Sequence, residues 1–243
     1  MIKAILTGHS KGLGVGIAQA LLAHGHPVLG LSRTENNDLQ REFPTLLQQI
    51  TADLSGPEAL DSLIRGNQLQ DFIENTTLLL LINNAGLVTP IGPLNAQNPS
   101  EISRSIHLNV TAPMVMSAAL AKLIKRNQAL RVLHVSSGAG RSAYPGWSVY
   151  CATKAALDMH AQAVQQDRQA NVTICSLAPG VIDTDMQAEI RQSDVALFPN
   201  KQRFIELNES GSLSSPRATG ERIVYYLLSP KFGSLAVDDL RSN

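Results

Sequence analysis

A tyrosine and a lysine four residues apart, Tyr150 and Lys154, have the types and spacing needed for proton transfer. Positions i and i+4 share one face of a helix, so the ammonium can lie close to the phenol. A free phenol has a pKa of about 10, whereas a catalytic group works best near the working pH. One positive charge about 4 Å away, at an effective dielectric of about 20, is worth about 4 kcal/mol. We therefore expect Lys154 to lower the pKa of Tyr150, although such a pair alone is also common on protein surfaces.

Two strands of a predicted parallel sheet end in polar residues. Ser136 and Ser137 end an apolar segment, and the segment before it ends in Asn83-Asn84-Ala85-Gly86. Open α/β sheets bind ligands at the carboxyl edge, where such strand ends meet. The sequence therefore predicts a ligand site at this edge.

The first apolar segment runs into a glycine-rich turn, Thr7-Gly8-His9-Ser10-Lys11-Gly12-Leu13-Gly14, and a helical segment follows. Glycines at positions 8, 12 and 14 allow a tight turn and a close approach of the backbone to a phosphate. The following helix offers free N–H groups at its N-terminus. A strand before the turn and a helix after it are the context that a dinucleotide-binding turn requires.

The second apolar segment ends in Leu31-Ser32-Arg33-Thr34, without the carboxylate that would bind a ribose 2′-OH in an NAD enzyme. Arg33 stands there instead, and Lys11 supplies a second cation in the glycine-rich turn. Two cations near one ribose suit a 2′-phosphate. The alternative is that both are solvated surface charges. We expect NADP(H) as the cofactor.

Short apolar segments alternate with longer segments of helical period, which predicts a doubly wound parallel α/β sheet, Rossmann-like, in one domain. The predicted strands are Lys3–Thr7, Val28–Ser32, Gln48–Ala52, Thr77–Ile82, Arg131–Ser136, Val172–Ala178 and Ser234–Val237. The predicted helices are Val15–His24, Pro57–Arg65, Pro99–Arg126, Ser148–Gln169 and Arg217–Leu228. The stretch 183–215 shows no strand pattern, and an insertion of this length after a strand favours a substrate lid over filler.

Composition excludes several other classes of protein. The 243 residues carry 20 Lys+Arg against 20 Asp+Glu, a balance that gives no basic surface for nucleic acid or an anionic membrane. The longest strongly apolar run, Leu78–Ile82, is far too short to span a membrane. Neither the two cysteines, Cys151 and Cys175, nor the six histidines have metal-ligand spacing, so we expect no metal site. We expect a cytoplasmic protein.

From end to end the sequence resembles the short-chain dehydrogenase/reductase family. The glycine-rich turn matches the cofactor turn of that family, and Asn83-Asn84-Ala85-Gly86 matches its sheet-stabilising motif. The catalytic Asn-Ser-Tyr-Lys tetrad of the family falls on Asn109, Ser137, Tyr150 and Lys154. The resemblance implies that Tyr150 protonates a ketone oxygen while NADPH delivers hydride. It also implies that Ser137 hydrogen-bonds that oxygen, that Lys154 binds the nicotinamide ribose, and that Asn109 holds a water.

The resemblance also implies the remaining cofactor contacts. Asp53-Leu54 resembles the pair that contacts adenine, and the segment Pro179-Gly180, Ile182 and Thr184 resembles the loop that holds the nicotinamide carboxamide. The expected cofactor residues are Gly8, Ser10, Lys11, Gly12, Leu13, Gly14, Arg33, Asp53, Leu54, Asn83, Ala85, Gly86, Tyr150, Lys154, Pro179, Gly180, Ile182 and Thr184.

Within the family, the segment 144–154, with its Gly-Trp and Tyr-Cys pairs, resembles sepiapterin reductases. The segment 179–187, followed by Phe198-Pro199-Asn200 and Arg203-Phe204, is similar to benzil reductases. This implies a ketone substrate, one carbonyl of a vicinal dicarbonyl. Trp147 and Asp238 are then the expected pocket residues, although the residues after Asp238 depart from the sepiapterin reductase pattern. The alternatives are a 3-oxoacyl thioester reductase and a catalytically silent NADP-binding regulator.

By the same resemblance we expect a homodimer or homotetramer. The segments 99–126 and 148–169 resemble the helices that pair between subunits in this family. Apolar side chains that could furnish the contact are Ala112, Val115, Ala119, Ala156, Met159 and Ala163. The alternative is that all of them pack against the sheet.

Overall fold

Seven short segments of the described chain form one sheet in which every pair of neighbouring strands is parallel. The strand order is β3-β2-β1-β4-β5-β6-β7 in the computed structural model, which describes residues 1–242. The strands are β1 (Ile2–Thr7), β2 (Val28–Ser32), β3 (Leu47–Thr51), β4 (Leu78–Asn83), β5 (Ala129–Val135), β6 (Val172–Ala178) and β7 (Val237–Asp239). The order reverses beside β1, so the first turn and the turn after β4 lie next to each other at the carboxyl edge.

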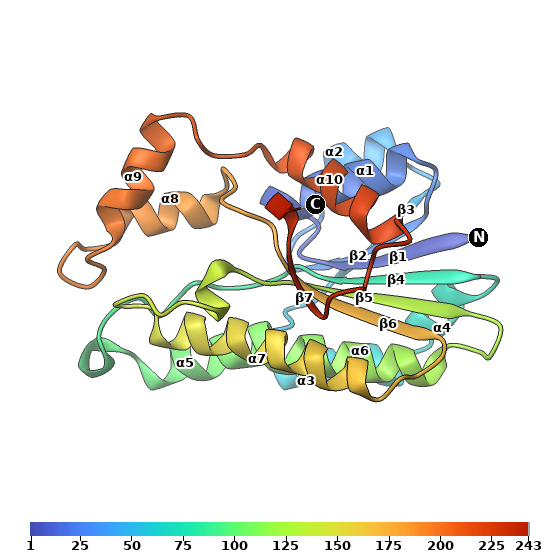
Figure 1. Ribbon diagram of the computed structural model, residues 1–243. Helices are drawn as coiled ribbons and strands as arrows, with labels where there is room; N and C mark the ends of the chain where they lie inside the picture. Colours follow the sequence, from blue (N-terminus) through green and yellow to red (C-terminus); the bar gives the residue numbers. More distant parts are fainter. Residues whose placement is uncertain (243) are drawn as a thin grey trace.

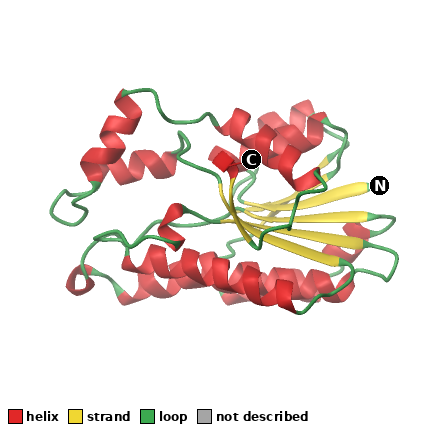
Figure 2. Cartoon of the chain, in the orientation of Figure 1, coloured by secondary structure: helices red, strands yellow, loops and turns green. Residues whose placement is uncertain are grey.

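Helices cover both faces of the sheet (Figures 1 and 2). On one face lie α1 (Gly12–Ala23), α2 (Asn37–Glu42) and α10 (Pro216–Leu228). On the other lie α3 (Pro57–Arg65), α4 (Gln68–Ile73), α5 (Pro99–Ile106), α6 (Ala112–Leu123) and α7 (Ser148–Gln166). Each face buries its own apolar core, because strands covered on both sides carry apolar residues at nearly every position. The predicted doubly wound fold is confirmed.

The predicted elements differ from the observed ones in two informative places. The predicted helix Pro99–Arg126 is two α-helices joined by a π-helical turn, His107–Thr111, which contains Asn109. The last strand is Val237–Asp239 rather than Ser234–Val237. It starts later because its pairing with β6 begins only at Ser176 and Val237.

Glycines bring α1 and α10 into close contact. A methyl group on Gly16 would lie 2.0 Å from the carbonyl oxygen of Pro216, and one on Gly220 would lie 2.2 Å from the backbone of Gly16. Only residues without a side chain allow backbones to approach this closely. α10 therefore packs directly on the backbone of α1, beside the sheet.

The stretch 183–215 forms α8 (Asp185–Gln192) and α9 (Lys201–Glu209), which project beyond the carboxyl edge of the sheet (Figure 1). The stretch is tied to the body by an isolated parallel bridge between Ile182 and Ser214. Its movement as a lid stays a prediction.

One continuous helical passage, Pro99–Leu123, has the length and mean hydropathy (1.2) of a membrane-crossing helix. Core helices of soluble proteins pass the same test. Met116 and Leu120 of this passage are fully buried in the core between the helices and the sheet.

Candidate active site

A cavity of about 790 Å³ opens along the carboxyl edge of the sheet. Its wall combines the glycine-rich turn, the ends of β4, β5 and β6, the start of α7 and the helices α8 and α9. Segments far apart in the sequence thus share one site. The predicted residues that line it are Gly8, Ser10, Lys11, Gly12, Leu13, Arg33, Asp53, Leu54, Ala85, Gly86, Ser137, Trp147, Tyr150, Lys154, Pro179, Gly180, Ile182 and Thr184.

The glycine-rich turn has the backbone geometry of a phosphate-binding turn. Gly8 and Gly12 adopt φ of 71° and 51°, in the left-handed region. A methyl group on Gly14 would lie 1.9 Å from the carbonyl oxygen of Gly8, so this glycine packs the helix against the turn and does not line the cavity. Among residues 1–242, no side chain caps the N-terminus of α1, which leaves its first N–H groups available to an anion.

Two cations stand at the end of the cavity near β2. Lys11 and Arg33 are exposed, and neither forms a salt bridge within residues 1–242. The residues next to them in sequence, Ser10 and Thr34, also line the cavity, and their hydroxyls are 3.1 Å apart. This end of the cavity can hold a phosphate monoester through two cations and two hydroxyls.

A buried polar brace joins the glycine-rich turn to the loop after β2. His9 is 1% exposed, and its Nε2 donates to Gln49 Oε1 at 2.7 Å. The same oxygen accepts from the backbone of Asn36 at 2.7 Å, and Asn36 Nδ2 donates to the carbonyl of Ser10 at 3.2 Å. Gly30 makes room for the His9 ring, because a methyl group there would lie 2.4 Å from it. The spacing of Lys11 and Arg33 therefore depends on side chains that face away from the cavity.

Tyr150, Ser137 and Lys154 meet near the middle of the cavity. Burial raises the pKa of Tyr150, and a hydrogen bond with Ser137 lowers it. Burial has the larger effect, so the pKa is about 12. Lys154 Nζ lies 5.6 Å from the centre of the Tyr150 ring and donates to the Val135 carbonyl at 2.8 Å. The prediction that Lys154 lowers the pKa of Tyr150 is wrong for this arrangement. The Lys154 ammonium is held by the Val135 carbonyl, and burial of the phenol has the larger effect. A phenol with such a pKa keeps its proton at neutral pH.

Lys154 is itself buried. Loss of hydration lowers the pKa of Lys154 to about 8, and the negative charge of Asp158 opposes this change. The ammonium therefore has a pKa close enough to neutrality to lose its proton in moderately alkaline solution.

Asn109 and Asn83 lie behind the cavity wall. Asn109 is 1% exposed; its Oδ1 accepts from the Leu87 amide and its Nδ2 donates to the Leu87 carbonyl, both at 2.8 Å. Asn83 Nδ2 donates to His134 Nδ1 at 3.1 Å. Asn109 therefore fixes the loop after β4 from behind, whereas Asn83 links the ends of β4 and β5, and a water held by Asn109 stays a prediction. Asn84, not Asn83, lines the cavity, and it donates to the carbonyls of Thr7 and Gly8.

Aromatic side chains form the far end of the cavity. Trp147 is 4% exposed and stacks on Phe198 with 4.6 Å between ring centres, and the Tyr150 and Phe204 rings both lie 5.3 Å from it. The indole thus belongs to a small core beneath α8 and α9 and also lines the cavity. Its Nε1 is buried without a hydrogen-bond partner among the described residues. This end suits a flat apolar group.

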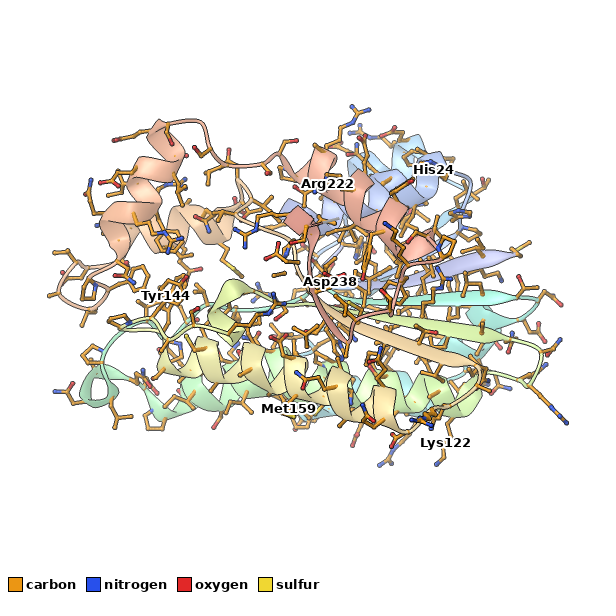
Figure 3. All side chains as sticks on the ribbon, viewed as in Figure 1. His24, Lys122, Tyr144, Met159, Arg222 and Asp238 are labelled. Carbon is orange, nitrogen blue, oxygen red and sulfur yellow. The ribbon has the colours of Figure 1, made fainter. Side chains whose placement is uncertain are left out.

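The structure corrects the prediction for Asp238. Asp238 lies on β7 near the end of the chain (Figure 3). Its carboxylate is buried, accepts from the Tyr226 hydroxyl at 2.7 Å, and does not line the cavity. The prediction rested on a match in position with a C-terminal aspartate of sepiapterin reductases, and such a match does not report on which face of β7 the side chain lies. It has a structural role in this fold.

Several lining residues were not among the predicted pocket residues, although the first two of them lie within the segments 144–154 and 179–187 that resemble known reductases. Tyr144 comes from the loop before α7, whereas Met186, Ile190 and Leu207 come from α8 and α9. The apolar spacing of residues 186 and 190 is a weak signal for a helix face turned toward a pocket.

Known proteins resemble this chain over nearly its whole length. Residues 3–195 match the family model described as short chain dehydrogenase. A benzil reductase ((S)-benzoin forming) of Bacillus cereus is 35% identical over 94% of both chains, and one of Bacillus subtilis (strain 168) is 38% identical over 87% of both. A sepiapterin reductase of Xenopus laevis is 29% identical over 96% of this chain and 93% of its own. The crystal structure of a short-chain dehydrogenase/reductase from Burkholderia vietnamiensis is 40% identical, with a TM-score of 0.73, over 99% of this chain and 97% of its own.

Proposed function

The chain belongs to the short-chain dehydrogenase family and is an oxidoreductase, and from this we propose that it reduces one carbonyl of a vicinal dicarbonyl with NADPH. One observation carries the proposal. A single cavity runs from the two cations beside the glycine-rich turn, past Tyr150, to the stacked aromatic rings around Trp147.

The residues present fit NADPH. The uncapped N-terminus of α1 and the glycines before it suit the pyrophosphate. Lys11 and Arg33, with the Ser10 and Thr34 hydroxyls, suit the 2′-phosphate that distinguishes NADPH from NADH. Asp53 and Leu54 lie on the wall beside Arg33, where the adenosine would bind. When bound, the cofactor supplies a hydride to the carbonyl carbon.

Tyr150 supplies the proton. Its phenol stays protonated at neutral pH, since burial raises its pKa to about 12, and it lies on the cavity wall beside Ser137. Ser137 Oγ accepts from the Ala139 amide at 3.2 Å and is hydrogen-bonded to Tyr150, so the two hydroxyls lie together where a substrate oxygen would receive their hydrogen bonds. The two groups stabilise the negative charge that develops on that oxygen, and Lys154 then stabilises the phenolate.

The aromatic end favours a flat, apolar dicarbonyl such as benzil. Trp147 and Phe204 offer ring faces and edges to an aryl group. A second carbonyl next to the first withdraws electron density and makes the carbon a better hydride acceptor. Sepiapterin is the weaker candidate, because Asp238 lies outside the cavity lining.

The test is a set of parallel assays with benzil, sepiapterin and a 3-oxoacyl thioester, each with NADPH and NADH. We expect turnover of benzil to the hydroxyketone with NADPH. Activity confined to the thioester would identify a 3-oxoacyl thioester reductase instead. Tight NADPH binding without turnover of any carbonyl compound would identify a silent regulator.

We further propose that the protein is a homodimer or homotetramer built on α7. Met159 is 63% exposed on this helix (Figure 3), and Ala163 is exposed one turn further along the same helix. Ala112 is buried against the sheet, so the contact uses fewer of the expected residues than the sequence suggested. Light scattering at micromolar concentration should give at least twice the chain mass, and Met159→Glu should reduce it. A monomeric mass for the wild type would contradict the proposal.

A further inference from the structure

Asp158 is a buried carboxylate for which the reaction described above has no role. It is 5% exposed and lies on α7, one helical turn after Lys154 and two after Tyr150. Residues at i, i+4 and i+8 share one face of a helix. The face of α7 that carries the tyrosine and the lysine into the cavity therefore continues to a negative charge.

Three donors from different parts of the fold converge on this carboxylate. Oδ1 accepts from the hydroxyls of Ser136 and Ser176, each at 2.7 Å, and Oδ2 lies 3.4 Å from Arg141 Nε. An isolated buried carboxylate is costly, so an ion kept inside a protein needs such partners. Gly140 leaves just enough space, because a methyl group there would lie 2.9 Å from Oδ2.

These bonds fix the strand end that carries the catalytic serine. Ser136, which Asp158 binds, stands between Val135 and Ser137. The Val135 carbonyl accepts from Lys154 Nζ at 2.8 Å, and the Ser137 hydroxyl is hydrogen-bonded to Tyr150. A shift of Ser136 would therefore move two partners of the reacting groups at once.

We propose that Asp158 is a positioning residue of the reaction. Its carboxylate holds the end of β5 in register with α7, and its negative charge keeps Lys154 in the ammonium form. The proposal rests on the proposed function in that its kinetic test needs NADPH-dependent turnover of a carbonyl substrate.

The groups around Lys154 support the claim that the negative charge of Asp158 keeps this lysine protonated. Burial lowers the pKa of Lys154 to about 8, and Asp158 is the group that opposes this change. His134, on β5, also faces Lys154, but burial lowers its pKa to about 3, so it stays neutral in any alkaline range. His160, hydrogen-bonded to His134 at 3.0 Å, has a pKa lowered by burial as well.

The other ionisable groups nearby lie on the loop after β5, on β6, on α10 and near the chain end. Arg141 contacts Asp158 and donates to the carbonyl of Asp238, and its Nη1 is 4.0 Å from Asp239.

The remaining ionisable groups lie on the cavity side or on the far side of Asp158. On the cavity side, Cys151 is next to Tyr150. On the far side of Asp158, burial raises the pKa of Cys175 to about 12 and also raises the pKa of Tyr226. Lys154 is thus the buried group expected to titrate between neutrality and pH 10.

The first experiment is Asp158→Asn in the full-length protein, assayed with NADPH and benzil across pH. The amide oxygen still accepts from the two serines, but the charge is lost. We expect kcat to fall, the KM for NADPH to change little, and the alkaline limb of the kcat profile to move to lower pH by about one unit. Asp167→Asn, an exposed aspartate at the end of the same helix, is the matched control and should leave the limb in place. Cys151→Ser should also leave it in place.

Arg141→Gln tests the effect of the Asp158 charge on Lys154 without changing Asp158 itself. It therefore does not depend on whether Asp158→Asn folds. The Arg141 side chain is 33% exposed, and its removal leaves the charge of Asp158 less neutralised. We expect the alkaline limb to move to higher pH, opposite to Asp158→Asn. Ser136→Ala, which removes a hydrogen bond but no charge, should lower kcat without moving the limb.

An NMR titration of the lysine ε-methylene groups, assigned with Lys154→Arg, separates this inference from the proposed function. It reports the protonation of Lys154 even in a protein that reduces no benzil. A Lys154 midpoint that is unchanged by both Asp158→Asn and Arg141→Gln overturns the inference. The wild type could turn over no carbonyl compound while the Lys154 midpoint still shifts in Asp158→Asn and Arg141→Gln as described. That result overturns only the proposed function.

Discussion

The two ends of the cavity are built in different ways. The pyrophosphate part of the cofactor end is made of backbone: Gly8 and Gly12 set the turn, and N–H groups at the start of α1 have no side-chain cap among the described residues. The substrate end is made of side chains from distant segments, with Trp147 held between Phe198 and Phe204. A turn made of backbone tolerates few changes and binds the same group throughout a family, whereas a pocket made of side chains can be rebuilt one residue at a time. Binding of the cofactor and choice of the substrate can therefore change separately.

The largest expected effect comes from Tyr150, where the two ends meet. Tyr150→Phe removes the transferable proton and leaves both ends intact, so kcat should fall by about 10²–10⁴-fold while NADPH affinity is kept. Stopped-flow kinetics and fluorescence titration of NADPH measure the two quantities. If the variant kept more than about a tenth of the wild-type kcat, Tyr150 would not be the general acid.

A change at the substrate end should affect benzil and not the cofactor. Trp147→Leu removes the ring that stacks on Phe198, and we expect kcat/KM for benzil to fall by about 10–200-fold, the range for lost apolar contacts in a pocket. The dissociation constant of NADPH should stay near that of the wild type. A comparable loss of NADPH affinity would show that the two ends are not independent.

A change at the cofactor end should have the opposite pattern. The wild type should prefer NADPH over NADH by at least about tenfold in kcat/KM, and Arg33→Ala should remove most of this preference, since a hydrogen bond to a charged group is worth about 1.5–3 kcal/mol. Arg65→Ala, on an exposed arginine of α3 outside the cavity lining, is the control. Equal use of both cofactors by the wild type would refute the role of Arg33.

The smallest expected effect concerns the brace behind the cofactor end. Gln49→Leu removes both hydrogen bonds that link His9 to Asn36. We expect the KM for NADPH to rise about fivefold, or about 1 kcal/mol, while kcat is kept, because the two lost bonds act on the cofactor only through the positions of Lys11 and Arg33. Gln48→Leu, the exposed neighbour on β3, should change neither value. Equal effects of the two substitutions would make the brace irrelevant to the cofactor.

The contrast between the ends also explains what the sequence could predict. The turn from Gly8 to Gly14 and the Tyr150–Lys154 pair are local patterns with fixed spacing, so both could be located before the fold was known. The contact of Trp147 with Phe198 joins residues 51 positions apart, and no periodicity in either segment indicates it. The pKa of Tyr150 was expected on the wrong side of 10, because spacing reports proximity to a charge but not depth of burial. The role inferred for Asp158 depends on four elements that only the tertiary structure brings together.

The glycine contact between α1 and α10 has a consequence for the order of events during synthesis. The helix that carries the phosphate-binding turn is complete after residue 23, but its packing partner is 216–228, and the backbones meet at Gly16 and Gly220. A ribosome must therefore translate through residue 228 before that helix can meet this partner. Until then the apolar side chains of α1, such as Ile17 and Leu21, have no cover from α10, and transiently exposed apolar surface of this kind favours aggregation of the nascent chain.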